Sequence, residues 1–247
     1  MLSFQHLSLR RQSKLLVEDA SLTIYAGFKV GLVGANGSGK TSLFKLILGE
    51  LDADQGRLEI PPSLRIAHMA QEVPASSMTA VDYVLSGDTS LQKVSEKIAV
   101  AEAKNDYTTI SALYEQYADL DGYTARSRAE QLLVGLGFSE SSFEQSLSVF
   151  SGGWRVRLNL ARTLMAPSEL LLLDEPTNHM DLPTIEWMEQ MLRQHKGALL
   201  VVSHDRAFLR NLGTGIIWLH RGTLRRRNGH FDEFESWSDG IMADEAV

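Results

Sequence analysis

One short segment constrains the fold of this chain more than any other feature. Residues Gly34–Thr41 have the sequence GANGSGKT, which satisfies the pattern G-x-x-x-x-G-K-[ST]. The segment follows an apolar run, Val30–Val33, and precedes a helical pattern that ends at Gly49. A glycine-rich turn between a strand and a helix is the setting in which this pattern forms a phosphate-binding loop, or P-loop. The sequence therefore predicts an α/β fold that binds a phosphorylated ligand.

The residue types of this loop suit the phosphates of a nucleotide. Glycines let successive backbone N–H groups turn toward phosphate oxygens, and the helix N-terminus adds partial positive charge. We expect Lys40 to neutralise phosphate oxygens and Thr41 to offer its hydroxyl to Mg²⁺. The predicted nucleotide-binding loop consists of Gly34, Ala35, Asn36, Gly37, Ser38, Gly39, Lys40 and Thr41.

A second feature is an acidic pair at the end of an apolar run. Leu170–Leu173 is typical of a strand buried on both faces, and Asp174 and Glu175 follow it directly. In α/β folds the carboxyl ends of the strands bind ligands. We expect Asp174 to hold Mg²⁺ through water and Glu175 to polarise the water that attacks the γ-phosphate. The alternative is an acidic pair that merely ends a strand, and the P-loop favours the catalytic hypothesis.

Composition narrows the class of protein. The chain has 247 residues, 44% apolar and 22% charged, which is ordinary globular usage and excludes disorder throughout. Its net charge of −7 makes it a poor generic polyanion binder, although a local basic face is compatible with that charge. It has no cysteine, which excludes disulfides, thiolate metal sites and a cysteine nucleophile. No apolar run approaches a bilayer span and no signal peptide is evident, so we expect a cytoplasmic protein.

The character of the chain changes twice along its length. Strand patterns dominate the first 70 residues, helical patterns follow, and α/β alternation returns after residue 165. We predict one domain over residues 1–247. Its nucleotide-binding α/β core with a β subdomain spans 1–71 and 166–234, its helical subdomain spans 72–165, and 235–247 is a tail or the start of a linker.

A further motif stands before the helix that starts at Trp154. It is Ser151-Gly152-Gly153, placed shortly upstream of Asp174. In this order, the P-loop, the serine-glycine motif and the acidic pair resemble the Walker A, signature and Walker B motifs of the ATP-binding-cassette (ABC) family. The resemblance implies an ABC-type ATPase domain, a P-loop NTPase with a RecA-like core, an antiparallel β subdomain and a helical subdomain. It also implies hydrolysis of ATP with Mg²⁺.

Three more positions match the family pattern. Gln71 resembles the Q-loop glutamine that contacts Mg²⁺ and the attacking water, and Asp181 resembles the D-loop aspartate at a cassette–cassette interface. His204 resembles the switch histidine that hydrogen-bonds the γ-phosphate. Taken singly, each position has a plainer explanation: Gln71 as a solvated loop residue, Asp181 as a helix cap and His204 as a satisfied polar group at a strand end. The ordered set of motifs favours the family roles instead. The resemblance assigns catalytic roles to Glu175, His204 and Gln71, metal contacts to Thr41, Gln71 and Asp174, and nucleotide contacts also to Ser151, Gly152, Gly153 and Asp181.

Other segments resemble the ABC-F branch of the family. They are DEPTNHMD at Asp174–Asp181, FSGGWR at Phe150–Arg155, SHDRAFL at Ser203–Leu209 and GHFDEF at Gly229–Phe234. ABC-F proteins pair two cassettes in one polypeptide, lack membrane domains and mostly act on ribosomes. The resemblance implies an N-terminal cassette whose partners are a second cassette, in the same parent chain or a homodimer, and the ribosome with its rRNA and tRNA. Alternatives are the ATPase subunit of an ABC transporter and a non-catalytic nucleotide-binding regulatory module.

Two segments bear on ribosome contact. Residues 91–120 are the candidate for the ribosome-touching arm of ABC-F proteins, and a slightly enlarged helical subdomain is the equally favoured alternative. The densest basic cluster consists of Arg221, Arg225, Arg226 and Arg227. Such a cluster can meet RNA phosphates, but a solvated edge strand is the commoner explanation.

One departure from the family pattern concerns the nucleobase. The family's A-loop aromatic, which stacks on adenine, should fall near Arg10–Arg11, and no aromatic residue is there. A planar guanidinium stacks on aromatic faces and is able to replace it. The sequence thus predicts phosphate binding and leaves base preference open.

Overall fold

The computed structural model describes residues 2–69, 76–213, 215–229 and 231–244. The chain divides into two compact units. The α/β unit consists of Met1–His68 and Ser168–Val247, and the helical unit consists of Met69–Pro167. The helical unit is thus an insertion in the sequence of the α/β unit.

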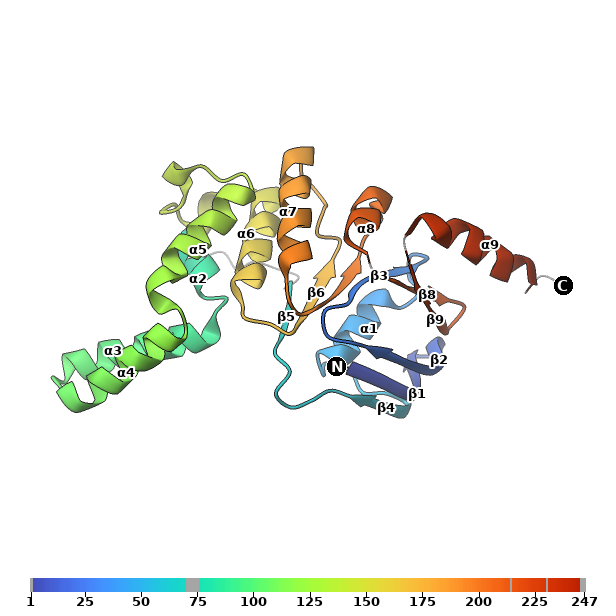
Figure 1. The fold of residues 1–247 in the computed structure, drawn as a ribbon, viewed down its shortest axis with the longest axis horizontal. Coiled ribbons are helices and arrows are strands. Elements are labelled where there is room, and N and C mark those ends of the chain that lie inside the picture. Colours follow the sequence, from blue (N-terminus) through green and yellow to red (C-terminus); the bar gives the residue numbers. More distant parts are fainter. Residues whose placement is uncertain (1, 70–75, 214, 230, 245–247) are drawn as a thin grey trace. The chain divides into compact units, whose positions relative to one another are not determined.

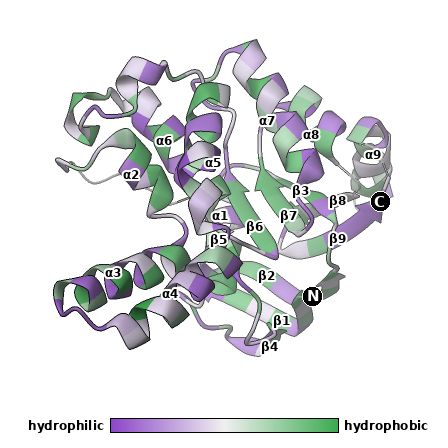
Figure 2. Ribbon diagram, turned by 60° about the vertical axis from the view of Figure 1, so that its left-hand side comes forward, coloured by the Kyte–Doolittle hydropathy of each residue, from purple (hydrophilic) through white to green (hydrophobic). Residues whose placement is uncertain are grey.

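A six-stranded sheet forms the centre of the α/β unit (Figure 1). Its strand order is β5-β6-β7-β3-β8-β9; β9 is antiparallel to β8, and the other pairs are parallel. The bounds are β3 (Lys29–Gly34), β5 (Ile66–His68), β6 (Leu170–Asp174), β7 (Ala198–Val202), β8 (Gly215–His220) and β9 (Thr223–Asn228). Strands β6 and β7 are apolar over almost their whole length, as is typical of a parallel sheet with helices on both faces, and both are green in Figure 2.

A smaller antiparallel sheet has the order β2-β1-β4, formed by β1 (Leu2–Arg11), β2 (Lys14–Ile24) and β4 (Gln55–Glu59). A clear strand pattern in the sequence covers only Ser21–Ile24 of β2, but the strand begins at Lys14. Its alternation is broken at Asp19, where φ is 45° and the pairing register with β1 shifts nearby. Such an irregularity hides a strand from a search for strict alternation.

One hydrophobic core joins both sheets and the helix after the P-loop, α1 (Lys40–Ile47). Leu170 and Leu172 of β6 belong to this core, while the side chains between them point to the opposite face. Helices α7 (Leu182–Gln194) and α8 (Arg206–Leu212) also belong to this unit. A Cβ at Gly31 of β3 would lie 3.1 Å from the Leu209 side chain, which shows how closely α8 packs on the sheet.

The end of the chain is helical over its described length. Residues 235–244, predicted as a tail or the start of a linker, belong to α9 (Phe234–Asp244), which follows a short 3-10 turn, Phe231–Glu233. The Trp218 ring lies 5.9 Å from the Phe234 ring and 5.7 Å from the Trp237 ring. Burial of these large aromatic faces compensates for the low helix propensity of a segment that contains Gly240.

The chain leaves and re-enters the α/β unit through the neighbouring strands β5 and β6. Just before them, the Arg65 guanidinium pairs with the Glu169 carboxylate at 2.5 Å, and the Arg65 N–H donates to the same carboxylate at 2.7 Å. These hydrogen bonds from Arg65 hold the pKa of Glu169 below its usual range. The ion pair fastens the two segments to each other.

The helical unit contains α2 (Ala80–Leu85), α3 (Thr89–Ala103), α4 (Tyr107–Asp119), α5 (Gly122–Gly135) and α6 (Gly152–Met165). Asp88 and Asp106 cap α3 and α4 by accepting the N–H groups of Leu91 and Thr109. The two capped helices form a hairpin, here called the α3–α4 hairpin (Figure 2). Its own buried cluster is small and consists of Val94, Ile98, Ala101 and Leu113.

Candidate nucleotide-binding site

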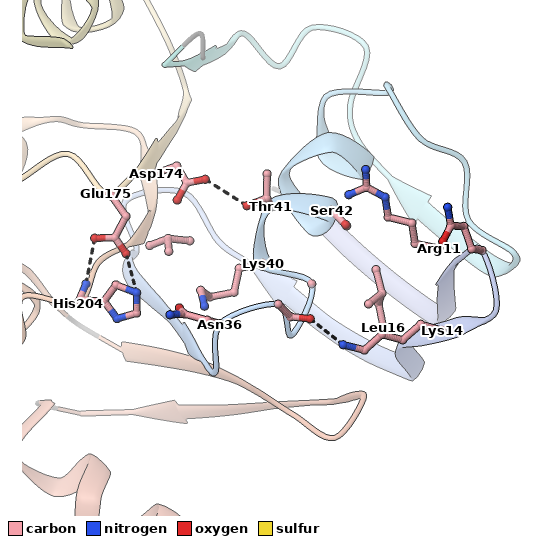
Figure 3. A pocket seen from close by; sticks show the side chains of 14 residues that line it. Arg11, Lys14, Leu16, Asn36, Lys40, Thr41, Ser42, Asp174, Glu175 and His204 are labelled. Carbon is pink, nitrogen blue, oxygen red and sulfur yellow. Dashed lines mark hydrogen bonds and ion pairs between the residues drawn. The ribbon is translucent and has the colours of Figure 1, made fainter. Parts of the chain in front are cut away.

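The carboxyl ends of three parallel strands meet at one edge of the six-stranded sheet. The P-loop follows β3, Asp174 and Glu175 lie at the end of β6, and His204 follows β7. They line one pocket of about 630 Å³ (Figure 3). Its lining residues are Arg11, Gln12, Lys14, Leu16, Asn36, Gly37, Gly39, Lys40, Thr41, Ser42, Asp174, Glu175, Val202 and His204.

Two glycines of the P-loop have conformations or contacts that exclude a side chain. Gly39 has φ of 117°, a region that favours glycine, and a Cβ there would lie 3.1 Å from Leu16 Cβ. A Cβ at Gly34 would lie 2.6 Å from the carbonyl oxygen of Leu219 on the neighbouring strand β8. The pattern glycines therefore let the loop pack directly against β2 and β8.

The Lys40 side chain folds along the inner edge of the loop. Its ammonium donates to the carbonyl oxygens of Gly34 at 2.7 Å and Ala35 at 3.0 Å. The charge is thereby held inside the curve of the P-loop, at the N-terminus of α1. A lysine and a helix N-terminus in one place both favour an anion.

Thr41 and Asp174 approach each other from different parts of the chain. The Thr41 hydroxyl donates to Asp174 Oδ2 at 3.3 Å, as Figure 3 shows. Mg²⁺ is commonly bound by one or two protein oxygens together with substrate phosphates and water. This pair, located at the mouth of an anion-binding loop, fits that ion.

Glu175 and His204 form the second polar contact of the pocket. The His204 backbone N–H donates to Glu175 Oε2 at 3.2 Å, and His204 Nε2 lies 3.4 Å from Glu175 Oε1. The Glu175 side chain is 21% exposed, whereas that of His204 is 65% exposed. Within the described part of the chain, Oε1 is buried and accepts no hydrogen bond. This oxygen is therefore an unsatisfied acceptor that lies beside the His204 ring.

The backbone of Glu175 is left-handed, with φ of 50°. This conformation costs a non-glycine residue about 1 kcal/mol, and residues held in it are concentrated at functional sites. The Glu175 N–H nevertheless donates to the Val202 carbonyl at 2.8 Å, so β7 fixes the turn. Such backbone strain is expected where the direction of a side chain, here the Glu175 carboxylate, is important for function.

The other predicted site residues have different positions. Ser151 is the N-cap residue of α6 in the helical unit, and Gly152 and Gly153 open that helix. A Cβ at Gly152 would meet nothing within 4 Å, so this N-terminus is uncrowded. Asp181 precedes α7, where its Oδ1 accepts the Thr184 hydroxyl at 2.6 Å. Gln71 and His230 lie outside the described residues, while Ser38 stays within the loop, where its amide donates to Ala35.

Three lining residues of the β1–β2 hairpin were not among the predicted site residues: Gln12, Lys14 and Leu16. The Lys14 ammonium donates to the Gly37 carbonyl at 3.0 Å and so connects the hairpin to the tip of the P-loop. The missing aromatic near Arg10–Arg11 was the only sequence signal for this region. Of those two arginines, Arg11 lines the pocket, whereas the Arg10 backbone N–H donates to Asp54.

Two residues of the arginine cluster, Arg226 and Arg227, lie on β9 and contact neighbouring segments of the chain. Arg226 donates to the Thr23 carbonyl at 2.6 Å and lies 4.7 Å above the Phe28 ring. Arg227 pairs with Glu233 at 2.5 Å. These contacts favour a structural role for the two arginines over RNA binding.

Comparisons with known proteins agree with this site. A family model described as ABC transporter matches residues 17–178. The chain is 45% identical over 235 residues to "Probable ATP-binding protein YheS" of Haemophilus influenzae, covering 95% of this chain and 37% of that protein. It is 36% identical to "ATP-binding cassette sub-family F member 2" of Mus musculus, covering 93% of this chain and 36% of that protein. The chain thus spans a little over a third of the length of these relatives.

Solved structures share the fold. "Structure of ATP binding subunit of ABC transporter" superposes with a TM-score of 0.73 at 18% identity, covering 97% of this chain and 93% of that chain. In the described part of this chain, no helix has the length and apolar character needed to cross a membrane. The family match covers more than half of the chain and includes the P-loop and the acidic pair. The chain belongs to the ATP-binding-cassette family and is a cassette of the ABC-F type.

Proposed function

We propose that this chain is an ATP-hydrolysing cassette of a cytoplasmic ABC-F protein, in which ATP-dependent closure against a second cassette is coupled to ribosome binding and translation regulation. The observation that carries the proposal is the convergence of Lys40, Thr41, Asp174, Glu175 and His204 in one pocket. A loop that only bound phosphate would not require the acidic and histidine side chains. These side chains suit the hydrolysis of a bound triphosphate.

Each of these residues has a separate task in the proposed reaction. The backbone amides of the P-loop and Lys40 bind the phosphates, and Thr41 and Asp174 hold Mg²⁺. The ion, when bound, neutralises charge that develops on the phosphate oxygens. The Glu175 carboxylate accepts a hydrogen bond from the attacking water and orients it toward the γ-phosphate. His204, which is more exposed and lies beside Glu175, donates a hydrogen bond to the γ-phosphate.

A complete site needs a second cassette. In the ABC family each ATP lies between the P-loop of one cassette and the signature motif of another. The uncrowded α6 N-terminus at Ser151, Gly152 and Gly153 supports this role, because its amides are open to a partner's γ-phosphate. Asp181 and Gln71 belong to the same proposal, as the interface aspartate and as a contact of Mg²⁺ and water.

The ribosome link rests on the ABC-F resemblance and on the α3–α4 hairpin. The hairpin covers most of residues 91–120, the candidate arm, and it exposes 76% of Tyr107 and 38% of Tyr114. Tyr107 lies at the turn between α3 and α4, where an exposed aromatic side chain provides a stacking surface for unpaired RNA bases, whereas the Tyr114 hydroxyl donates to Glu102. The hairpin is therefore the surface that we assign to rRNA or tRNA contact.

The test uses the intact parent protein with the substitution Glu175→Gln. This variant keeps the shape of the side chain and loses the carboxylate, so we expect it to bind ATP and remain closed. Ribosomes are pelleted from lysates supplied with ATP or ADP, and the bound protein is quantified. We expect co-sedimentation with ATP and at least tenfold less with ADP.

The matched control is Glu175→Gln combined with Lys40→Ala, which removes the phosphate-binding charge and should abolish the ATP-dependent binding. Equal binding with ATP and ADP would exclude closure as the coupling step. Absence from ribosomes together with recovery in the membrane fraction would instead favour the ABC-transporter subunit.

A further inference from the structure

The two ends of the pocket differ in chemistry, as Figure 3 shows. At one end lie Asp174, Glu175 and His204, which face the position of the γ-phosphate in the proposed reaction. The other end is formed by the tip of the β1–β2 hairpin. Because the P-loop lies between the two ends and holds the phosphates, a bound nucleotide must direct its base toward the hairpin.

The hairpin end lacks the usual platform for a base. Among the described residues that line the pocket, none is Phe, Tyr or Trp. Leu16 is 5% exposed and packs against the P-loop at Gly39, so only a small part of its side chain is accessible to a base. The Arg11 side chain extends from the hairpin tip toward Ser42 (Figure 3). Its guanidinium is planar, delocalised and suited to stacking on a flat aromatic ligand.

We propose that Arg11 is the residue that contacts the nucleobase, with its guanidinium against the face of the base, and that this cassette discriminates weakly between adenine and guanine. The inference rests on the proposed nucleotide binding. Face-on stacking tolerates any base, because every base has a π-face. The N–H donors of a guanidinium lie in its own plane, so a guanidinium stacked on a base does not read the edge acceptors, N7 in adenine and N7 with O6 in guanine. Nothing in such a contact rejects GTP.

Two neighbouring cations provide comparisons for this role. Lys14 is engaged with the Gly37 carbonyl at 3.0 Å, so it supports the loop and is not positioned as a base platform. Arg10 is next to Arg11 in the sequence, is exposed like it and does not line the pocket. Arg10→Ala therefore removes the same charge from the same strand and leaves the base end unchanged.

The experiment separates base contact from phosphate contact. Binding of ATP, GTP and inorganic tripolyphosphate, each with Mg²⁺, is measured by calorimetry on the 247-residue chain and on Arg11→Ala, Arg11→Lys, Arg11→Tyr and Arg10→Ala. For the unaltered chain we expect dissociation constants for ATP and GTP within about threefold of each other. Loss of one stacked base is equivalent to about tenfold in affinity.

We accordingly expect Arg11→Ala and Arg11→Lys to weaken ATP and GTP by about tenfold, while tripolyphosphate changes by less than about threefold. Arg11→Lys keeps the charge, so its loss of nucleotide affinity isolates the planar group. Arg11→Tyr supplies an aromatic face and should bind both nucleotides at least as well as the unaltered chain. Arg10→Ala should bind all three ligands normally, and circular dichroism checks that every variant is folded.

Several results would overturn the proposal. Tripolyphosphate weakened as much as ATP in Arg11→Ala would make Arg11 a phosphate ligand. Unchanged nucleotide binding in that variant would remove Arg11 from the base site, and an ATP preference above tenfold in the unaltered chain would refute weak discrimination. In each of these cases nucleotide binding itself stands. If the unaltered chain binds none of the three ligands, the proposed function fails as well, and Lys40→Ala serves as the reference for loss of phosphate binding.

Discussion

The α/β unit and the α3–α4 hairpin are stabilised in different ways. In the α/β unit a single core joins two sheets and α1, and side chains such as Leu32 and Leu172 are fully inaccessible. In the hairpin four buried residues are supplemented by aspartate N-caps and by a hydrogen bond from the Tyr114 hydroxyl to Glu102. Phosphate chemistry needs groups fixed to a fraction of an ångström, which the large core provides. The ribosome contact that we propose for the hairpin has no such requirement, so the hairpin tolerates a smaller core.

The largest expected difference between the two regions is catalytic. Glu175→Gln should reduce ATP hydrolysis by roughly 10²–10⁴-fold, because a general base contributes about that much, while the ATP dissociation constant changes little. Steady-state hydrolysis by the intact parent protein measures the rate, with its second site inactivated by the equivalent substitution. Turnover at the parental rate would remove Glu175 from its assigned role.

Removal of the hairpin should have the complementary effect. Replacement of residues 92–117 by a short Gly-Ser turn should leave the dissociation constant for MgATP within about twofold, because the described pocket lining comes from the α/β unit alone. Ribosome co-sedimentation of the same variant in the Glu175→Gln background should fall by at least tenfold. ATP binding that is lost together with the hairpin would contradict the separation of the two regions.

Stability should differ in the same direction. Leu172→Ala in β6 should lower the free energy of unfolding by about 4 kcal/mol, because Leu172 is fully buried in a core that relaxes little. Ile98→Ala should cost about 2 kcal/mol or less, since Ile98 is 8% exposed and belongs to a cluster of four. Urea denaturation gives both values. Equal losses would show that the hairpin is as tightly packed as the sheet.

The smallest effect concerns the Asp106 cap of α4. Hydrogen bonds from the Thr109 hydroxyl and amide hold the pKa of Asp106 below its ordinary value. A lowered folded pKa means that the cap stabilises α4 above the unfolded pKa and that this contribution is lost as the pH falls through the folded pKa. The NMR shift of the Thr109 amide should therefore titrate below the ordinary aspartate range. Asp106→Asn, which also caps helices, should abolish that titration.

The parts of the fold that sequence predicts well are those with strong local patterns. The strand before the P-loop, β6 and β7 are apolar runs, and α1, α6 and α7 have helical periodicity. The first half of β2 is concealed by its irregularity at Asp19. Helix α8 has seven residues, and α9 depends on aromatic contacts with Trp218, which lies on β8. Such elements form because of tertiary packing, and a local sequence pattern carries no information about that packing.

In the candidate site, too, the residues in local motifs were predictable and those placed by tertiary packing were not. Its motif residues lie at strand ends, where parallel topology brings them together, so Lys40, Thr41, Asp174, Glu175 and His204 were predictable. The hairpin residues Gln12, Lys14 and Leu16 reach the pocket because β1 and β2 fold over the P-loop, which no spacing in the sequence encodes. The left-handed backbone of Glu175 was equally hidden, since glutamate gives no propensity signal for it.

The fastening of β5 to β6 has a consequence for how this chain varies in length. The two strands are parallel neighbours, and the chain that crosses from one to the other is the entire helical unit. For a flexible connection, each doubling of length adds only about 0.6 kcal/mol of closure entropy. Arg65 and Glu169 hold the two ends of the crossover together. For the stability of the sheet, an insertion in the helical unit therefore has about the same effect as lengthening a loop. A lineage can therefore lengthen, shorten or replace the hairpin with almost no thermodynamic penalty to the strands that carry the phosphate-binding loop.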